Sequence, residues 1–68
     1  MHAVTPAPLE PLLTARQVAG LLSVSQHWVL QHALGRRRPV LPSVKLGKFV
    51  RFRASQLAQW LKEMERAA

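Results

Sequence analysis

The stretch LTARQVAGLLSVSQHWVLQHALG, residues 13–35, decides the fold, because its pattern predicts two short helices joined by a tight turn. Thr14 and Gln17 are spaced as a capping box, in which each side chain bonds the backbone amide of the other residue. Leu13 before the cap and Val18 four residues after it fit the hydrophobic staple. The first helix is therefore expected to begin after Thr14 and to end at about residue 22.

The second helix is bounded by residues that favour helix ends. Ser25 is a good N-cap, and Gly35 suits the position after the last turn, so this helix is expected over residues 26–34. Two helices joined by so short a turn must cross steeply, which is the helix-turn-helix geometry. Ser23 stands where such turns often have glycine, and His32 stands where a hydrophobic residue is common. The apolar residues expected to pack between the helices and into the core are Val18, Ala19, Leu21, Leu22, Val24, Val29 and Ala33.

Beyond Arg36 the hydrophobic period changes from 3.6 to 2, which predicts a β-hairpin over residues 44–53 with Gly47 in its turn. A two-residue turn, Gly47-Lys48, would pair Val44 with Arg51. A three-residue turn that also includes Phe49 would instead turn all four apolar strand residues toward the core, namely Val44, Leu46, Val50 and Phe52. Burial favours the longer turn.

With the longer turn, Lys45, Arg51 and Arg53 are expected to share the outer face of the hairpin, with Lys48 and Phe49 at its tip. Phe49 has two open interpretations: it inserts at a DNA base step, or it packs down onto the sheet. A third helix is expected from about Ala54, with one apolar stripe that is better explained as core than as a ligand site. The stripe consists of Leu57, Trp60, Leu61 and Met64.

These elements define a mainly α fold with a small β-hairpin, a winged helix-turn-helix of three helices and a two-stranded wing over residues 12–68. Residues 1–11 contain three prolines and are expected to be a disordered lead. The chain has no cysteine, no apolar run long enough to span a membrane and no secretion signal. We therefore expect a cytoplasmic protein.

The charge is strongly one-sided, with ten Lys and Arg against three acidic residues and a formal net charge of +7. From Arg16 to Arg53 there are eight basic residues and no acidic one. Such a field attracts a polyanion, of which duplex DNA is the densest common example. An anionic membrane or an acidic protein is the alternative partner that charge alone leaves open.

Catalysis has little support in the sequence. There is no aspartate, and Glu10, Glu63 and Glu65 lie near the chain ends. His27 and His32 are five residues apart, which is not the i, i+4 spacing that places two metal ligands on one helical face. We expect no catalytic residue, no metal, no cofactor and no small-molecule substrate.

The second helix carries the residues expected to read DNA, because a recognition helix contacts bases through side chains near its N-terminus. His27 and Gln31 face away from Val29, and Gln26 lies on the flank of the helix. These three residues are the candidates for base contacts, with Ser25 for a phosphate. For Trp28, contact with a thymine methyl or sugar and a packing role are equally supported.

Basic residues elsewhere are candidates for the DNA backbone or the minor groove. Arg36, Arg37 and Arg38 follow the recognition helix and form either a phosphate clamp, with one arginine in the minor groove, or a solvated loop. The remaining candidates are Arg16, Lys45, Lys48 and Arg51.

The order of segments resembles the excisionase family, small winged-helix proteins similar to the DNA-binding domain of MerR regulators. The segments that carry the likeness are LLTARQVA (12–19), LSVS (22–25), VKLGKFVRF (44–52) and LAQWL (57–61). The resemblance implies a recognition helix in the major groove and a wing against the adjacent minor groove. It places Ser25, Gln26, His27, Gln31, Lys48 and Arg51 at the positions expected to meet DNA.

Excisionases are recombination directionality factors that bend DNA at attachment sites and help a tyrosine integrase to excise a phage or mobile element. The resemblance therefore implies a bacterial or phage-encoded, nucleoid-associated protein whose partners are duplex DNA, a tyrosine integrase and neighbouring copies of itself. A small transcriptional regulator of the AlpA type is the alternative within the same class. An interaction protein whose basic face binds an acidic protein partner is the alternative from another class.

Overall fold

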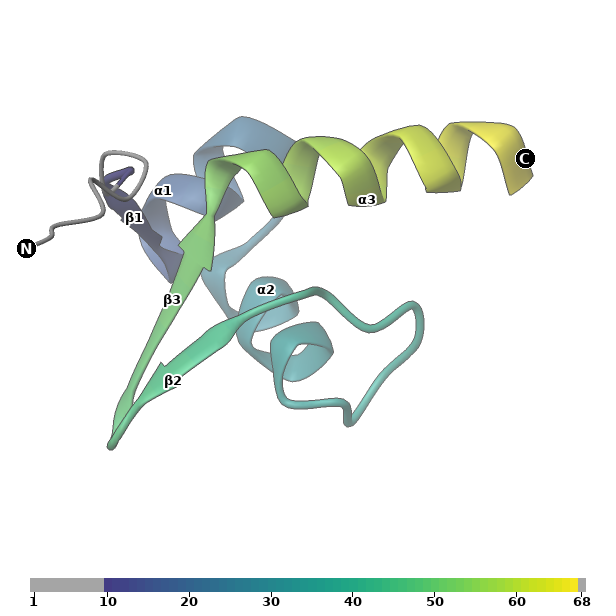
Figure 1. The fold of residues 1–68 in the computed structure, drawn as a ribbon. Helices are drawn as coiled ribbons and strands as arrows, with labels where there is room; N and C mark the ends of the chain where they lie inside the picture. The colour runs from purple at the N-terminus through teal and green to yellow at the C-terminus, as the bar shows by residue number, and fades with distance from the viewer. Residues whose placement is uncertain (1–9, 68) are drawn as a thin grey trace, which may run out of the picture.

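The computed structural model describes residues 10–67, which form three helices and a three-stranded antiparallel sheet (Figure 1). The elements follow in the order β1 (Leu12–Thr14), α1 (Ala15–Leu22), α2 (Gln26–Ala33), β2 (Val44–Leu46), β3 (Phe49–Arg53) and α3 (Ala54–Ala67). The prediction of a mainly helical domain with a small β-hairpin is confirmed, and β1 adds a third strand that the sequence pattern did not reveal. Residues 1–9, most of the predicted disordered lead, lie outside the described residues.

The start of α1 has the predicted capping box. The Gln17 amide donates to Thr14 Oγ1 at 3.1 Å, and the Thr14 amide donates to Gln17 Oε1 at 2.9 Å. Both bonds satisfy backbone amides that the first turn of a helix leaves without partners. Of the predicted staple pair, Val18 is buried in the core and Leu13 is partly buried against it.

The turn between α1 and α2 is held by the backbone conformation of one residue. Ser23 adopts the left-handed region, with φ at 58°, and the Val24 amide donates to the Ala19 carbonyl at 3.0 Å. The Ser25 hydroxyl then accepts from the Trp28 amide at 3.0 Å and starts α2. Gly35, with φ at +77°, follows the last turn of α2 as predicted.

The β2–β3 hairpin has the two-residue turn, so the predicted three-residue turn is wrong. Val44 pairs with Arg51, Lys45 with Val50, and Leu46 with Phe49, which leaves only Gly47 and Lys48 in the turn. Gly47 has φ at +64° and Lys48 has a negative φ. A glycine with positive φ at the first turn position is typical of the II′ turn, whose twist matches that of the flanking strands.

The shorter turn changes which hairpin residues face the core. Because side chains alternate along a strand, Lys45 shares a face with Val50 and Phe52, and lies opposite to Arg51 and Arg53. The expected grouping of Lys45 with those arginines is therefore wrong. Leu46 is not buried as predicted, because its side chain is 49% exposed beside Phe49 on the outer face.

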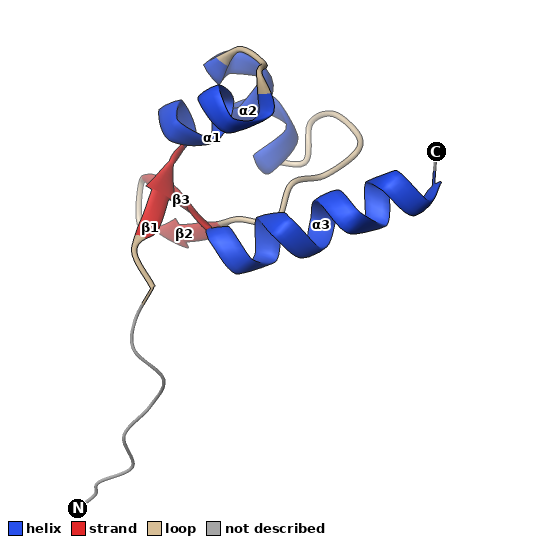
Figure 2. Ribbon diagram, turned by 90° about the horizontal axis from the view of Figure 1, so that it is seen from above, coloured by secondary structure: helices blue, strands red, loops and turns tan. Residues whose placement is uncertain are grey.

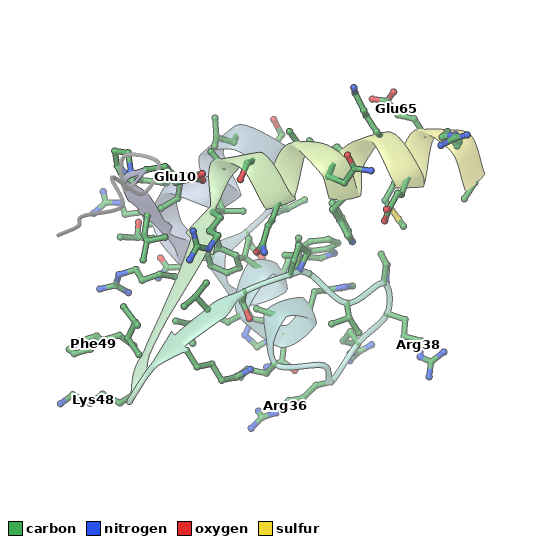
Figure 3. All side chains as sticks on the ribbon, viewed as in Figure 1. Glu10, Arg36, Arg38, Lys48, Phe49 and Glu65 are labelled. Carbon is green, nitrogen blue, oxygen red and sulfur yellow. The ribbon has the colours of Figure 1, made fainter. Side chains whose placement is uncertain are left out.

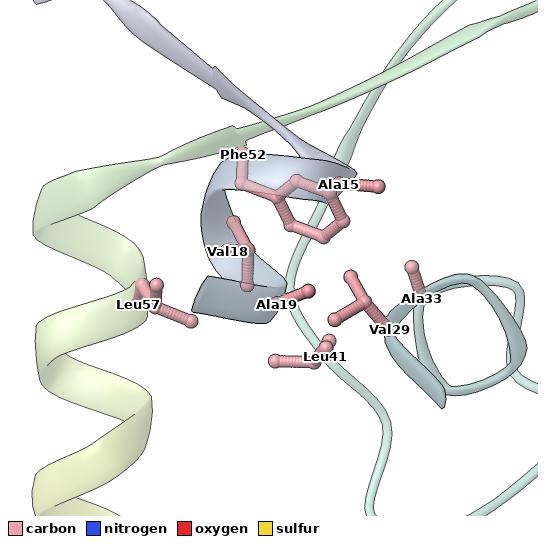
Figure 4. Close-up of a cluster of buried hydrophobic side chains, with 8 residues drawn as sticks. All are labelled: Ala15, Val18, Ala19, Val29, Ala33, Leu41, Phe52 and Leu57. Atoms are coloured by element: carbon pink, nitrogen blue, oxygen red, sulfur yellow. The ribbon is translucent and has the colours of Figure 1, made fainter. Parts of the chain in front are cut away.

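The buried core lies where α1, α2, β3 and α3 meet (Figure 4). Its members are Ala15, Val18, Ala19, Val29, Ala33, Leu41, Phe52 and Leu57. Leu41, from the segment after α2, was not among the predicted core residues. Leu21 was, yet its side chain is 65% exposed because it lies on the solvent side of α1.

The third helix continues directly from β3 and packs on the core through its first two turns only. Leu57 is buried and Trp60 is half-buried against the core, whereas Leu61 is 37% exposed, so the predicted apolar stripe is only partly covered. The helix runs apart from the α1–α2 pair in the view from above (Figure 2). At its first turn, Ser55 Oγ donates to the carboxylate of Glu10 at 3.1 Å, which ties a residue of the predicted lead to α3.

Candidate nucleic-acid interface

The exposed side of α2 is set by the burial of its opposite side. Val29 is fully buried and Ala33 nearly so, as the helical projection predicts. Gln26 and His27 are consequently exposed on the first turn, and Gln31 is half-buried one turn later. The Ser25 hydroxyl oxygen accepts from the Trp28 amide, and within residues 10–67 its proton has no acceptor.

A pocket of about 250 Å³ lies against this side of α2. It brings together five residues that the sequence predicts at the DNA interface, from both the helix and the loop after it. The pocket is lined by Ser25, His27, Trp28, Gln31, His32 and Arg37. Most of these side chains carry hydrogen-bond donors or acceptors, which suits the pocket to a polar edge such as that of a base or a phosphate.

Trp28 has a packing role in this pocket. Its ring stacks on that of His32, with centroids 3.7 Å apart and an interplanar angle of 17°. Trp28 is half-buried, so the packing interpretation is supported, while one edge of the ring still lines the pocket.

His32 is a pocket-lining residue that sequence reasoning did not place in the candidate site. The side chain is 7% exposed, and its Nδ1–H donates to the Pro39 carbonyl at 2.6 Å. The imidazole therefore fills a position where a hydrophobic residue is common, because its ring stacks on Trp28 and its polar atom has a partner. The sequence gives no signal for this bond, since Pro39 lies seven residues away in an irregular segment.

The loop after α2, residues 34–43, is fastened to the helix by backbone hydrogen bonds. The Arg36 amide donates to the Gln31 carbonyl at 3.0 Å, and the Leu41 amide donates to the His32 carbonyl at 3.1 Å. Arg36, Arg37 and Arg38 are all exposed along this loop. Only Arg37 lines the α2 pocket, whereas Arg36 and Arg38 project from the body of the molecule (Figure 3).

The hairpin contributes two cations that lie around one aromatic ring. Lys48 Nζ lies 5.6 Å from the centroid of Phe49, and the Arg51 guanidinium carbon lies 5.2 Å from it. Arg51 also donates to the Val50 carbonyl at 2.9 Å and is half-buried, so part of its hydrogen-bonding capacity is already used. Phe49 itself is 51% exposed, so about half of its surface is free to contact a partner.

The remaining candidates stand apart from this group. Lys45 is exposed on the other face of the hairpin, and Arg16 is exposed on the first turn of α1. Neither residue lines the α2 pocket.

Charge is unevenly distributed over the molecule. Arg36, Arg38 and Lys48 lie on the side of the hairpin tip and the loop after α2, whereas Glu10 and Glu65 lie on the α3 side (Figure 3). The α2 side would therefore attract a polyanion more strongly than the α3 side would.

Within residues 10–67, no group of three or more His, Asp or Glu side chains is placed to hold a metal ion. None of the helices in that range has the length and apolarity that a membrane crossing requires. Comparisons with protein-family models, curated proteins and solved structures give no significant match to the chain.

Proposed function

We propose that this chain is a winged helix-turn-helix protein that binds double-stranded DNA, with α2 as the recognition helix and the β2–β3 hairpin as the wing. The observation that carries the proposal is the α2 pocket, where His27 and Gln31 of the helix meet Arg37 of the loop. A recognition helix needs this combination, because amide and imidazole groups bond base edges while guanidinium groups bond phosphates. No carboxylate lines the pocket to repel a phosphate.

The distribution of charge supports DNA over the other partners. The α2 side carries the projecting cations Arg36, Arg38 and Lys48 beside polar, uncharged groups that can bond bases. An anionic membrane or a generally acidic protein would be attracted by the cations but would gain little from the hydrogen-bonding side chains.

A mobility-shift or fluorescence-anisotropy titration against random-sequence duplex tests the proposal. We expect binding whose logarithmic affinity falls linearly with the logarithm of the salt concentration, by about 0.9 for each phosphate contact. An absence of duplex binding at moderate salt would contradict it.

Two substitutions separate the expected base contacts from the phosphate contacts. His27→Ala should reduce the preference for the best sites found by selection from a random duplex pool, because His27 is proposed to contact base edges. Arg37→Ala should weaken binding to all duplexes alike. If Arg37→Ala changed only the sequence preference, the assignment of the loop to phosphates would be wrong.

On the resemblance to excisionases, we propose that the bound protein bends DNA at attachment sites and assists a tyrosine integrase in excision. An excision assay with a tyrosine integrase and its attachment sites tests this role. Stimulated excision supports a directionality factor. Duplex binding without any effect on excision, together with repression or activation of a neighbouring promoter, would instead indicate an AlpA-type regulator.

A further inference from the structure

The tip of the β2–β3 hairpin carries two large apolar side chains that the fold leaves uncovered. Leu46 and Phe49 are direct cross-strand partners on either side of the Gly47-Lys48 turn. They lie on the same face of the hairpin and are 49% and 51% exposed. Phe52 is the residue of the hairpin that is fully buried in the core. Leu46 and Phe49 lie nearer the tip, so these two side chains contribute little to the core.

Cations frame this apolar pair. Lys48 Nζ and the Arg51 guanidinium carbon lie 5.6 Å and 5.2 Å from the Phe49 ring centroid. The bond from Arg51 to the Val50 carbonyl, at 2.9 Å, helps to hold that guanidinium beside the ring. The tip therefore presents an apolar wedge between positive charges, at the extreme end of a projecting hairpin (Figure 3).

The two-residue turn makes this end narrow. Only Gly47 and Lys48 connect the strands, and Gly47 has no side chain. Side chains at the end of so narrow a ribbon can reach into the DNA minor groove, which is about 6 Å wide, while the strands remain outside.

We infer that Phe49 and Leu46 insert between base pairs from the minor groove and kink the duplex, while Lys48 and Arg51 hold the flanking phosphates. The inference rests on the proposed DNA binding and states how that binding deforms DNA. Apolar side chains that enter a base step unstack it partly and bend the duplex toward the major groove. Pyrimidine–purine steps such as TA unstack most easily, so the wedge should favour them.

A membrane surface is the other partner that a cation-framed aromatic residue could suit. The position of the tip favours DNA, because the tip lies on the same side of the molecule as Arg36 and Arg38. The α2 pocket, which Arg37 of the same loop lines, offers hydrogen-bonding side chains that lipid headgroups would not need in that arrangement.

The experiment measures unwinding, since a wedged base step is also untwisted. Relaxed closed-circular plasmid is treated with topoisomerase I in the presence of the full chain, and its linking number is read on gels after the protein is removed. Binding to the same plasmid is measured separately by mobility shift. We expect the wild-type protein to lower the linking number in proportion to the amount bound.

Variants of the tip then assign the effect to the apolar pair. Phe49→Ala combined with Leu46→Ala should lose the change in linking number when it is compared with the wild type at equal amounts of protein bound to the plasmid. Phe49→Leu should retain much of the change, because leucine also acts as a wedge. Val40→Ala, which trims another apolar side chain that is 50% exposed, is the matched control and should behave as wild type.

The outcomes distinguish this inference from the proposed function. If the wild-type protein binds plasmid without changing its linking number, or if the double variant changes it as the wild type does, the wedge is overturned and DNA binding stands. If the wild-type protein binds no duplex, the proposed function itself fails. Sedimentation of the wild-type protein, but not of the double variant, with phosphatidylglycerol-containing vesicles and no unwinding would overturn the wedge in favour of a membrane surface.

Discussion

At Ser23 the backbone enters the left-handed region with φ at 58°, which a residue with a Cβ adopts at a cost of roughly 1 kcal/mol or more. The conformation is imposed by the short connection between α1 and α2, because the Val24 amide must reach the Ala19 carbonyl at 3.0 Å. Glycine is common at this position for the same reason. The tight turn between the two helices is therefore maintained against a local strain at one residue.

We predict that Ser23→Gly stabilises the protein. We expect the free energy gained by relieving the strain to exceed the cost of the more flexible unfolded chain by about 0.5 kcal/mol. This difference corresponds to a rise of about 2–4 °C in Tm for a chain of this size. Thermal unfolding followed by circular dichroism measures the change. The control is Ser43→Gly, the same substitution at a residue whose φ is negative, and it should lower Tm slightly. Equal effects of the two substitutions would show that Ser23 is not strained.

At the scale of elements, the helices were predictable and the hairpin register was not. Helix ends are encoded locally, by Thr14 with Gln17 and by Ser25, so a few neighbouring residues suffice to place them. The register argument assumed that every apolar strand residue would be buried. Turn chemistry at Gly47 decided the register instead, and Leu46 was left exposed.

Contacts between segments that are far apart in the sequence could not be predicted either. Nothing local to Leu12–Thr14 indicates a strand, because three residues are too few to show an alternation of apolar and polar side chains. The residues of β3 with which they pair lie 37 or more residues further along the chain. The candidate site could likewise be predicted only in part. The exposed residues of α2 follow from helical projection, whereas the His32 bond to Pro39 and the approach of Arg37 to the pocket depend on the path of the loop.

The loop after α2 is held by its hydrogen bonds to the helix and by one buried apolar side chain. Leu41 is 1% exposed in the core, and its amide bonds the His32 carbonyl. We predict that Leu41→Ala costs about 2–5 kcal/mol, a large part of the roughly 3–10 kcal/mol available to a domain of this size. Urea unfolding measures the loss. Val40→Ala next to it, where the side chain is 50% exposed, should change stability by less than about 0.5 kcal/mol. Similar losses at both positions would refute the anchoring role of Leu41.

At the scale of the whole molecule, the position of a charge should affect DNA binding more than the net charge does. Arg37→Ala and Arg66→Ala each remove one positive charge from the formal +7. Arg37 lines the α2 pocket, whereas Arg66 lies in the last turn of α3. The two variants therefore have equal net charge and differ only in where the charge is lost.

We predict that Arg37→Ala reduces the salt slope of duplex binding by about 0.9 and that Arg66→Ala leaves it nearly unchanged. Anisotropy titrations at several salt concentrations give both slopes. Equal reductions in the two variants would mean that the protein binds DNA through its overall charge, without a defined orientation.

The one-sided placement of cations gives the molecule an electric dipole. Arg36, Arg38 and Lys48 mark its positive end. On α3, Lys62 and Arg66 offset Glu63 and Glu65, so the net charge there is small. In the field of a polyanion such a dipole experiences a torque, so the protein would rotate its positive end forward before any contact forms. Fewer encounters would then be wasted in unproductive orientations, and the association rate would gain most at low ionic strength, where the field reaches furthest.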